Sequence, residues 1–193
     1  LDALDHFNLR MAQTGAILIH YRAHFIRKLA EYAPAVHRDF SGGREALSLR
    51  YETVKTVAHP EDPPKVLLPA LLEHQETHRQ VELDARQCLS GPHKDDLAVE
   101  LDGVSAKQFA SQGQTRTAAL SLKLGAREIF FHDTGEWPVL LLDDVLSELD
   151  QRRQDFVLSR ISGGQVFITC CEEEKAERLG DGRAFRIREG ALV

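Results

Sequence analysis

A short apolar run that ends in two adjacent carboxylates constrains this chain more than any other feature. Residues 138–142 read Pro-Val-Leu-Leu-Leu, and Asp143 and Asp144 follow at once. Such a run is typical of a strand covered on both faces, and open α/β sheets bind ligands at the carboxyl ends of these strands. Two like charges there must be solvated, paired or bound to a cation, so the stretch predicts a Mg²⁺ site beside a phosphate. The plainer alternative is a turn with both acids in solvent.

The composition limits the class of protein without deciding its function. The chain has 193 residues, 42% of them hydrophobic, and a net charge of −6, which is ordinary for a globular protein. Residues 1–58 carry 8 Lys and Arg against 6 Asp and Glu, so this part favours any contact with a polyanion over the acidic remainder. The alternative is a solvated surface of mixed charge. Three cysteines without framework spacing indicate a reducing compartment. No apolar run reaches the roughly 18 residues of a membrane span, and no signal peptide is visible.

The first half of the chain predicts mostly helix with a small β insertion. Apolar residues recur at steps of three and four over residues 1–33, which indicates one or two long helices that Pro34 ends or restarts. Residues 47–51 alternate like a half-buried strand. A proline-rich stretch at 59–64 reads as a linker, and a second helix is expected over 66–88.

Basic side chains on the first helical stretch are candidates for phosphate contacts. Arg22, Arg27 and Lys28 are the residues we predict to meet DNA if this part of the chain binds it. The alternative is that they form the polar face of an amphipathic helix.

The second half predicts an α/β lobe. A strand over 97–101 runs into Asp102-Gly103, a dipeptide typical of tight turns, and a helix is expected from about 115 to 132. After the strand at 138–142 we expect a helix opened by Ser147 and Asp150 and running to about 161, a strand over 165–170, a helix over 172–179, and strands over 183–188 and 191–193. Alternating strands and helices of this kind are characteristic of α/β folds.

The Ser-Gln-Gly-Gln segment at 111–114 precedes a predicted helix. A serine and a glycine there put a hydroxyl and free backbone N–H groups at the positive end of the helix, which is a natural phosphate site. Plain helix capping by Ser111 is the alternative, and the segment alone does not decide between the two.

Two histidine pairs have a spacing that could bind a metal, but the neighbouring residues do not support a metal site. His20 and His24, like His74 and His78, are four residues apart and would share one face of a helix. The zincin pattern needs Glu directly after the first histidine, and Gln75 stands there. Ordinary structural histidines are the favoured interpretation.

Four pieces of the chain occur in the order found in the second half of an ABC-type ATPase head. They are Ser-Gln-Gly-Gln at 111–114, the strand ending in Asp143-Asp144, Ser-Glu-Leu-Asp at 147–150, and the strand ending in Thr169-Cys170. They resemble the signature motif, the Walker B strand, the D-loop and the switch position. Together with the Gly-Pro-His-Lys-Asp-Asp loop at 91–96, the sequences of these motifs are most similar to the RecF family, which is related to the SMC heads. The resemblance is strong over about 90–171 and loose over the helical first half.

This resemblance implies roles for the acids. Asp143 would be the Walker B acid that orders Mg²⁺, and Asp144 would be the catalytic carboxylate that positions or activates water. Many ABC heads have Glu at the second position, so the shorter Asp144 implies slow hydrolysis. Cys170 falls at the switch position, where many transporters have a histidine. A thiol cannot hydrogen-bond the γ-phosphate in the same way, which puts the usual hydrolytic switch in doubt.

The resemblance also implies an ATP site shared between two protomers. Ser111 and Gly113 would contact the γ-phosphate of ATP held on the other protomer, and Gln112 and Gln114 would support that loop. The D-loop would consist of Ser147, Glu148 and Asp150, with Asp150 across the dimer interface.

The phosphate cradle of such ATPases has no counterpart in this sequence. No G-x-x-x-x-G-K-[ST] pattern occurs, and in this family that pattern lies before the arm. We therefore expect the chain to be the C-terminal portion of a longer protein, with a helical arm or lid at 1–90 and an ABC-ATPase lobe at 91–193. The intact protein is expected to be a slow, DNA-stimulated ATPase, and this chain alone to be inactive.

The function implied is that of an ATP-switched DNA-binding recombination mediator with ATP and Mg²⁺ as cofactors. It would form an ATP-dependent homodimer, bind gapped or junction DNA, and help RecO and RecR to load RecA, in the cytoplasm at the nucleoid and without a membrane partner. Two alternatives stay open: the nucleotide-binding subunit of an ABC transporter, and a non-catalytic ABC-like interaction module. The long helical segment before the signature argues against the first. The second is disfavoured because Asp143, Asp144, Ser111 and Gly113 all suit the chemistry.

Overall fold

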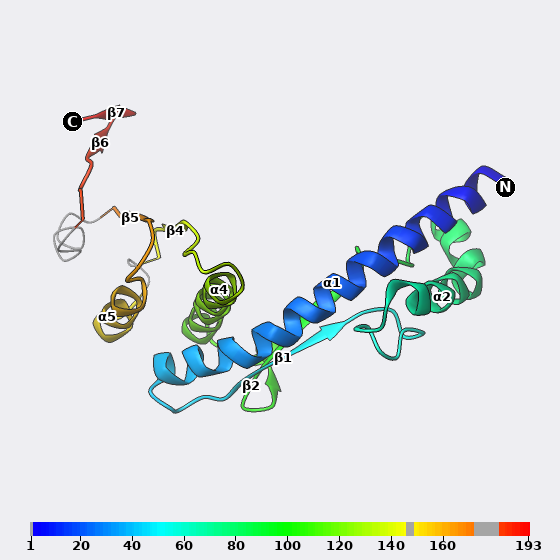
Figure 1. Cartoon of the computed structure of the whole chain (residues 1–193), viewed down its shortest axis with the longest axis horizontal. Helices are drawn as coiled ribbons and strands as arrows, with labels where there is room; N and C mark the ends of the chain where they lie inside the picture. Colours follow the sequence, from blue (N-terminus) through cyan, green and yellow to red (C-terminus); the bar gives the residue numbers. More distant parts are fainter. Residues whose placement is uncertain (1, 146–148, 172–181) are drawn as a thin grey trace. The chain divides into compact units, whose positions relative to one another are not determined.

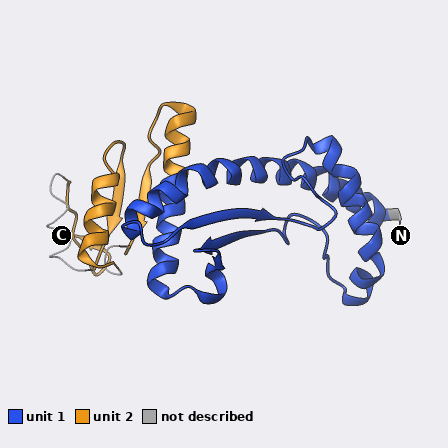
Figure 2. Ribbon diagram, turned by 90° about the horizontal axis from the view of Figure 1, so that it is seen from below, with its two compact units in different colours: residues 1–125 blue, residues 126–193 orange. Residues whose placement is uncertain are grey.

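The computed structural model describes residues 2–145, 149–171 and 182–193. They form two compact units, residues 1–125 and 126–193, coloured separately in Figure 2. The helix predicted over 172–179 lies outside the described residues, as do Ser147 and Glu148. The compact units do not test the predicted division of the intact protein at residue 90, which stays a prediction.

One long helix, α1 (Asp2–Ser41), dominates the first unit and is drawn in blue in Figure 1. Its buried stripe consists mainly of small side chains at steps of four, three and four: Ala12, Ala16, Ile19 and Ala23. The expectation that Pro34 ends or restarts the helix was wrong, since Pro34 lies inside α1. An internal proline costs about 3 kcal/mol. The neighbouring side chains of Ala33, Val36 and His37 are buried, and their packing favours continuing the helix.

Three antiparallel strands form the sheet of the first unit, in the order β1–β2–β3. β1 (Leu47–Glu52) pairs along its whole length with β2 (Asp96–Leu101), which turns into β3 (Val104–Ser105). The turn residues Asp102 and Gly103 have φ angles of 52° and 78°, the left-handed values that a tight hairpin turn requires. Both strand predictions and the turn prediction are therefore confirmed. The sheet joins segments that lie on either side of α2 in the sequence.

The second helix, α2 (Pro64–Ala85), closes the core of the first unit. It lies beside the N-terminal half of α1 in Figure 1. The buried apolar cluster here contains Ala12, Ala16 and Ile19 from α1, Val54 and Val57 from the loop after β1, and Leu67 and Leu71 from α2. A short helix, α3 (Ala106–Phe109), leads on to α4. None of the helices in the described ranges is both long enough and apolar enough to cross a bilayer.

The second unit contains a strand–helix–strand arrangement with parallel strands. The division at residue 125 falls inside α4 (Gln112–Thr134), after which come β4 (Leu140–Asp143), α5 (Gln151–Arg160) and β5 (Val166–Thr169). β4 and β5 pair in parallel, from Leu140↔Val166 to Asp143↔Thr169. A small hairpin of β6 (Ile187–Arg188) and β7 (Ala191–Leu192) follows. The predicted order of strand, helix and strand after residue 138 is confirmed.

A buried arginine fixes the turn that leads into β5. The Arg127 guanidinium lies 4.2 Å over the ring of Trp137 and donates hydrogen bonds to the carbonyl oxygens of Arg160 and Gly163. Gly163 is needed because a Cβ atom at this position would lie 2.6 Å from the Trp137 ring. This packing holds the end of α5 and the start of β5 against the segment before β4, and so sets the register of the two strands.

Candidate functional site

The two predicted acids lie where β4 ends, and a threonine on β5 binds both. Asp143 and Thr169 are register partners in the parallel sheet. The Thr169 hydroxyl donates to Oδ1 of Asp143 at 2.5 Å and accepts from the backbone N–H of Asp144 at 3.0 Å. A hydroxyl has one donor and two acceptor positions, so both bonds can exist at once. Thr169 therefore holds the first carboxylate and the backbone of the second.

Asp144 has a left-handed backbone conformation. Its φ angle is 48°, a region that few residues other than Gly, Asn and Asp adopt. The backbone therefore leaves the strand at Asp144, and the two adjacent acids do not simply alternate across a sheet. Strain of this kind is common where a side chain must be aimed, which fits the catalytic role predicted for Asp144.

The acids have the chemistry of a magnesium site. Thr169 engages one oxygen of Asp143, and both acids are exposed to solvent. Mg²⁺ is usually held by one or two carboxylates together with waters and phosphate oxygens, so a dense ligand cluster is not required. In the described part of the chain, no three His, Cys, Asp or Glu side chains group as a metal site. Asp143 therefore suits a cation that arrives with a nucleotide.

The sequence analysis assigned no role to Thr169 and placed the switch position at its neighbour Cys170. The signal that identifies Thr169 is strand register, because it becomes the partner of Asp143 only when β4 and β5 pair in parallel. Cys170 is a partly buried cysteine directly after β5 and takes part in no disulfide. Its assignment to the switch position stays a prediction.

β4 is not covered on both faces as its apolar run predicted. Leu140 and Leu142 are 6% and 2% exposed, but Leu141 between them is 63% exposed. Its register partner Phe167 is 51% exposed on the same face. Side chains of neighbouring residues alternate between the faces of a strand, and within the described ranges one face of this two-stranded sheet lacks a cover. Parallel sheets are normally buried on both sides, so an exposed apolar face of this kind is unusual for such a sheet.

The Ser-Gln-Gly-Gln segment forms a capping box at the start of α4. Ser111 Oγ accepts from the backbone N–H of Gln114 at 3.3 Å, and Oε1 of Gln114 accepts from the backbone N–H of Ser111 at 2.9 Å. Capping and phosphate binding looked like alternatives in the sequence, but they are compatible. The bond to Gln114 uses an acceptor position of Ser111 and leaves its O–H free to donate.

The start of α4 also offers backbone donors. With Ser111 as the capping residue, the N–H groups of Gln112 and Gly113 have no acceptor within the helix. These groups and the Ser111 hydroxyl converge on the positive end of a helix of 23 residues. The arrangement suits an anion with several oxygens, which fits the phosphate contact predicted for this segment.

Asp150, the last residue of the predicted D-loop, is the N-cap of α5. Its Oδ1 accepts from the backbone N–H of Arg153 at 3.0 Å, and its Oδ2 lies 3.3 Å from Nη1 of the same residue. The helix therefore begins after Asp150, and the predicted capping role of Ser147 lies outside the described residues. Nearby, the buried amide of Gln154 donates to the carbonyl oxygen of Leu149 and ties the loop to the helix.

Replacing Asp150 by alanine is expected to lower the free energy of unfolding by about 1 kcal/mol, the usual cost of losing an N-cap. Asp150→Asn is expected to change it by only a few tenths of a kcal/mol, because asparagine caps as well as aspartate. Urea denaturation of the two variants measures the difference. Equal stabilities would contradict the capping role.

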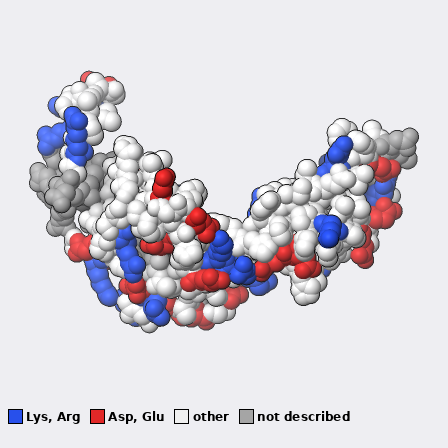
Figure 3. Space-filling model, viewed as in Figure 1, with Lys and Arg blue, Asp and Glu red and all other residues white. Residues whose placement is uncertain are grey.

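The basic residues predicted to bind DNA already have partners in the protein. Nη1 of Arg22 donates to the carbonyl oxygen of Pro92 at 2.6 Å, and Nε of Arg27 lies 2.8 Å from Oε2 of Glu61. Lys28 lies on the same helix. On the face drawn in Figure 3, Lys and Arg side chains lie among Asp and Glu side chains. Pairing reduces the charge available to phosphates, and the DNA contacts of these three residues stay a prediction.

Arg22 also connects α1 to the loop at 91–96. Its guanidinium lies 3.6 Å from Asp95, whose side chain is 2% exposed and accepts a hydrogen bond from the Tyr51 hydroxyl. Burial, together with the bond to Asp95 and the charge of Asp95, raises the pKa of Tyr51 well above its usual range. Tyr51 therefore stays a neutral donor, and the loop is fixed to both α1 and β1.

These features define the second half of an ABC-type ATPase head: a parallel strand ending in two acids, and a helix that begins with Ser-Gln-Gly-Gln. No protein-family profile matches the chain. Among curated proteins, the DNA replication and repair protein RecF of Acetivibrio thermocellus is 38% identical over 192 residues, and RecF of Listeria monocytogenes is 39% identical over 192 residues. Both comparisons cover 98% of this chain, and they cover 52% and 51% of the two relatives.

Solved structures agree with the sequence comparison. The recombination mediator protein RecF-ATPrS in the RecFOR pathway has a TM-score of 0.82 and 30% identity, covering 99% of this chain and 50% of that one. RecF-ATP in the same pathway has a TM-score of 0.80 and 30% identity, covering 100% of this chain and 51% of that one. The chain is thus homologous to RecF and has its ABC-ATPase fold, as predicted. It spans about half the length of the curated relatives that it matches.

Proposed function

We propose that this chain supplies the signature and Walker B part of an ATP-dependent recombination mediator that binds DNA. The observation that carries the proposal is similarity to RecF along the whole chain, including structures of RecF with ATP and ATPrS. The geometry supports it, because the two motif regions have the donors and acceptors that ATP and Mg²⁺ require. Gapped or junction DNA, RecO and RecR as partners, and the loading of RecA are parts of the same proposal.

In this proposal each motif residue has a separate role in binding or hydrolysing ATP. Mg²⁺ would neutralise phosphate charge when ATP is bound, and Asp143 would hold it through water. Asp144 would orient the attacking water and accept its proton. The Ser111 hydroxyl and the first N–H groups of α4 would bind the γ-phosphate of ATP held by a second protomer, so that ATP joins two copies of the protein.

The exposed apolar face of β4 and β5 fits a larger head. We propose that the part of the intact protein corresponding to the other half of RecF covers Leu141 and Phe167. Burying a leucine contributes about 1.5–3 kcal/mol. Leu141→Gln in the intact protein is therefore expected to lower the free energy of unfolding by about 2 kcal/mol, despite the exposure of this residue in the described chain.

Val66 offers the matched control for Leu141→Gln. It lies on α2 and is 51% exposed. Val66→Gln is expected to change the free energy of unfolding by at most about 0.5 kcal/mol, the usual range for surface positions. Denaturant titration of both variants makes the comparison. Equal, small effects would mean that the β4–β5 face stays open in the intact protein.

The proposed function is tested by the oligomeric state of the intact protein. Sedimentation velocity with and without ATP and Mg²⁺ is expected to give a dimer only when both are present. A monomer under both conditions would contradict the proposal, and co-purification with a membrane complex would favour a transporter subunit.

A further inference from the structure

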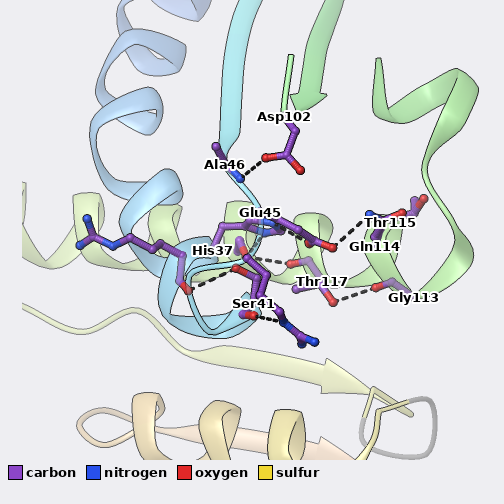
Figure 4. Close-up of polar contacts among 12 residues, drawn as sticks. His37, Ser41, Glu45, Ala46, Asp102, Gly113, Gln114, Thr115 and Thr117 are labelled. Carbon is purple, nitrogen blue, oxygen red and sulfur yellow. Dashed lines mark hydrogen bonds and ion pairs between the residues drawn. The ribbon is translucent and has the colours of Figure 1, made fainter. Parts of the chain in front are cut away.

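A closed circuit of polar contacts links the signature segment to the C-terminal end of α1. Figure 4 shows the side chains of His37, Glu45, Gln114 and Thr117 in one cluster, where the end of α1, the loop before β1 and the start of α4 come together. All of these residues belong to the first unit. The circuit contains groups to which the proposed ATP chemistry assigns no role.

Gln114 is the point where the signature segment enters the circuit. Its Oε1 accepts from the backbone N–H of Ser111, and its Nε2 donates to Oε1 of Glu45 at 3.0 Å. The amide is therefore held at both ends. Gln114 also fixes the backbone of Ser111, so a change in the position of Glu45 changes the position of Ser111 as well.

The loop that carries Glu45 is itself fixed. Ala46 donates its N–H to Oδ1 of Asp102 at 2.8 Å, and its carbonyl oxygen accepts from the N–H of Asp102 at 2.8 Å. On the other side of Glu45, Nε of Arg44 donates to the carbonyl oxygen of Ser41 at 2.9 Å. The backbone around Glu45 is thus tied to both the β2–β3 turn and the end of α1, which makes Glu45 a firm support for the amide.

His37 closes the circuit from inside α1. Its side chain is completely buried, and its Nδ1 lies 3.1 Å from Oγ of Ser121. Ser121 Oγ also lies 2.8 Å from the carbonyl oxygen of Thr117, so this hydroxyl joins His37 to the backbone of α4. The Thr117 hydroxyl in turn donates to the carbonyl oxygen of Gly113 at 2.7 Å, back in the signature segment.

The remaining nitrogen of His37 faces Glu45. Nε2 lies 3.2 Å from Oε2 of Glu45, in an ion-pair contact that is not aligned as a hydrogen bond. Glu45 therefore lies between two contacts, with one carboxylate oxygen toward His37 and the other toward Gln114.

We propose that Glu45, supported by His37, is a positioning residue for the signature motif. It holds Gln114, and through it Ser111 and the first turn of α4, in the geometry that binds the phosphate of the partner's ATP. Preorganised donors bind more tightly because no ordering cost is paid on association. The circuit also means that the C-terminal end of α1 and the ATP interface are coupled mechanically. This inference rests on the proposed function of Ser111 as a phosphate donor.

Two substitutions at Glu45 separate the proposed role from a general effect of the carboxylate. Glu45→Ala removes the acceptor for Gln114 and is expected to raise the protein concentration at which half of the intact protein dimerises with ATP by about tenfold, the effect of one charge-assisted bond. Glu45→Gln keeps an oxygen acceptor for Gln114 and fills the same space beside His37, so its midpoint is expected within about threefold of the wild type. Sedimentation velocity at several protein concentrations measures the midpoints. Glu73→Ala, an exposed glutamate on α2, is the matched control and is expected to change nothing.

A double-mutant cycle tests whether the effect passes through Gln114. If the Glu45–Gln114 contact carries it, Glu45→Ala combined with Gln114→Ala will be no weaker in dimerisation than Gln114→Ala alone. Additive losses would overturn the proposal, as would equal losses in Glu45→Ala and Glu45→Gln. Should Glu45→Ala melt below the assay temperature, Glu45→Met fills the same space without a strong acceptor and replaces it in the cycle.

The outcome can be separated from a failure of the proposed function. Ser111→Arg abolishes ATP-dependent dimerisation if Ser111 binds phosphate. Loss of dimerisation in Ser111→Arg with a wild-type midpoint in Glu45→Ala would overturn the role of Glu45 alone. Normal dimerisation in Ser111→Arg would overturn the proposed function itself.

Discussion

Ser111→Arg in the intact protein is expected to abolish dimerisation with ATP, raising the midpoint concentration by at least about 100-fold. The substitution removes a hydroxyl that donates to phosphate, which is a charge-assisted bond of about 1.5–3 kcal/mol. It also places a long side chain at the start of α4, where phosphate oxygens must come within about 3 Å of the Gln112 and Gly113 N–H groups. The positive charge of the new side chain does not offset this loss, because its bulk holds the phosphate away from the fixed donors. Sedimentation velocity in ATP and Mg²⁺ measures the midpoint.

Two controls separate phosphate binding from folding. Ser159→Arg introduces the same side chain on an exposed position of α5 and is expected to leave dimerisation unchanged. Loss of the Ser111 cap destabilises α4 by about 1 kcal/mol, so melting temperatures of both variants are recorded with the midpoints. A Ser111→Arg protein that is folded and dimerises like the wild type would show that the segment caps a helix and does nothing more.

Local chemistry explains which parts of the fold were predictable. The hairpin at Asp102-Gly103 follows from the left-handed preference of that dipeptide, and β1 and β2 follow from alternation. The prediction that Pro34 ends or restarts the first helix was wrong, because the energetic cost of a proline can be seen in the local sequence. The packing of Ala33, Val36 and His37, which favours continuing the helix, depends on residues elsewhere in the fold. β4 was recognised as a strand, but its exposed face depends on what surrounds the sheet.

The candidate site divides in the same way. The acids and the Ser-Gln-Gly-Gln segment are contiguous in sequence, so their residue types reveal them. Thr169, Glu45 and His37 are not, because each acquires its role from a partner far along the chain. Glu45 is 69 residues from Gln114, and His37 is 84 residues from Ser121. No local pattern marks such residues, and only the fold brings them to the motifs that they support.

The backbone of Asp144 makes an unusually clean test of catalysis possible. Asparagine tolerates the left-handed conformation as aspartate does, so Asp144→Asn preserves the fold of the turn. Its backbone N–H still donates to Thr169 Oγ1, and Asp143 keeps its own bond to the same hydroxyl. The substitution therefore removes the carboxylate and keeps the conformation of the turn.

Asp144→Asn is expected to lower the rate of ATP hydrolysis by the intact protein by at least about 100-fold, the usual contribution of a general base. Dimerisation with ATP is expected to persist, since the amide still fits the site and the phosphate is held by other groups. Steady-state release of phosphate, measured with and without DNA, gives the rate, and Asp155→Asn on the exposed face of α5 is the control. Unchanged hydrolysis in Asp144→Asn would assign the catalytic carboxylate elsewhere. Slow hydrolysis with a persistent dimer would instead mean that ATP binding forms the dimer and that hydrolysis at Asp144 dissociates it.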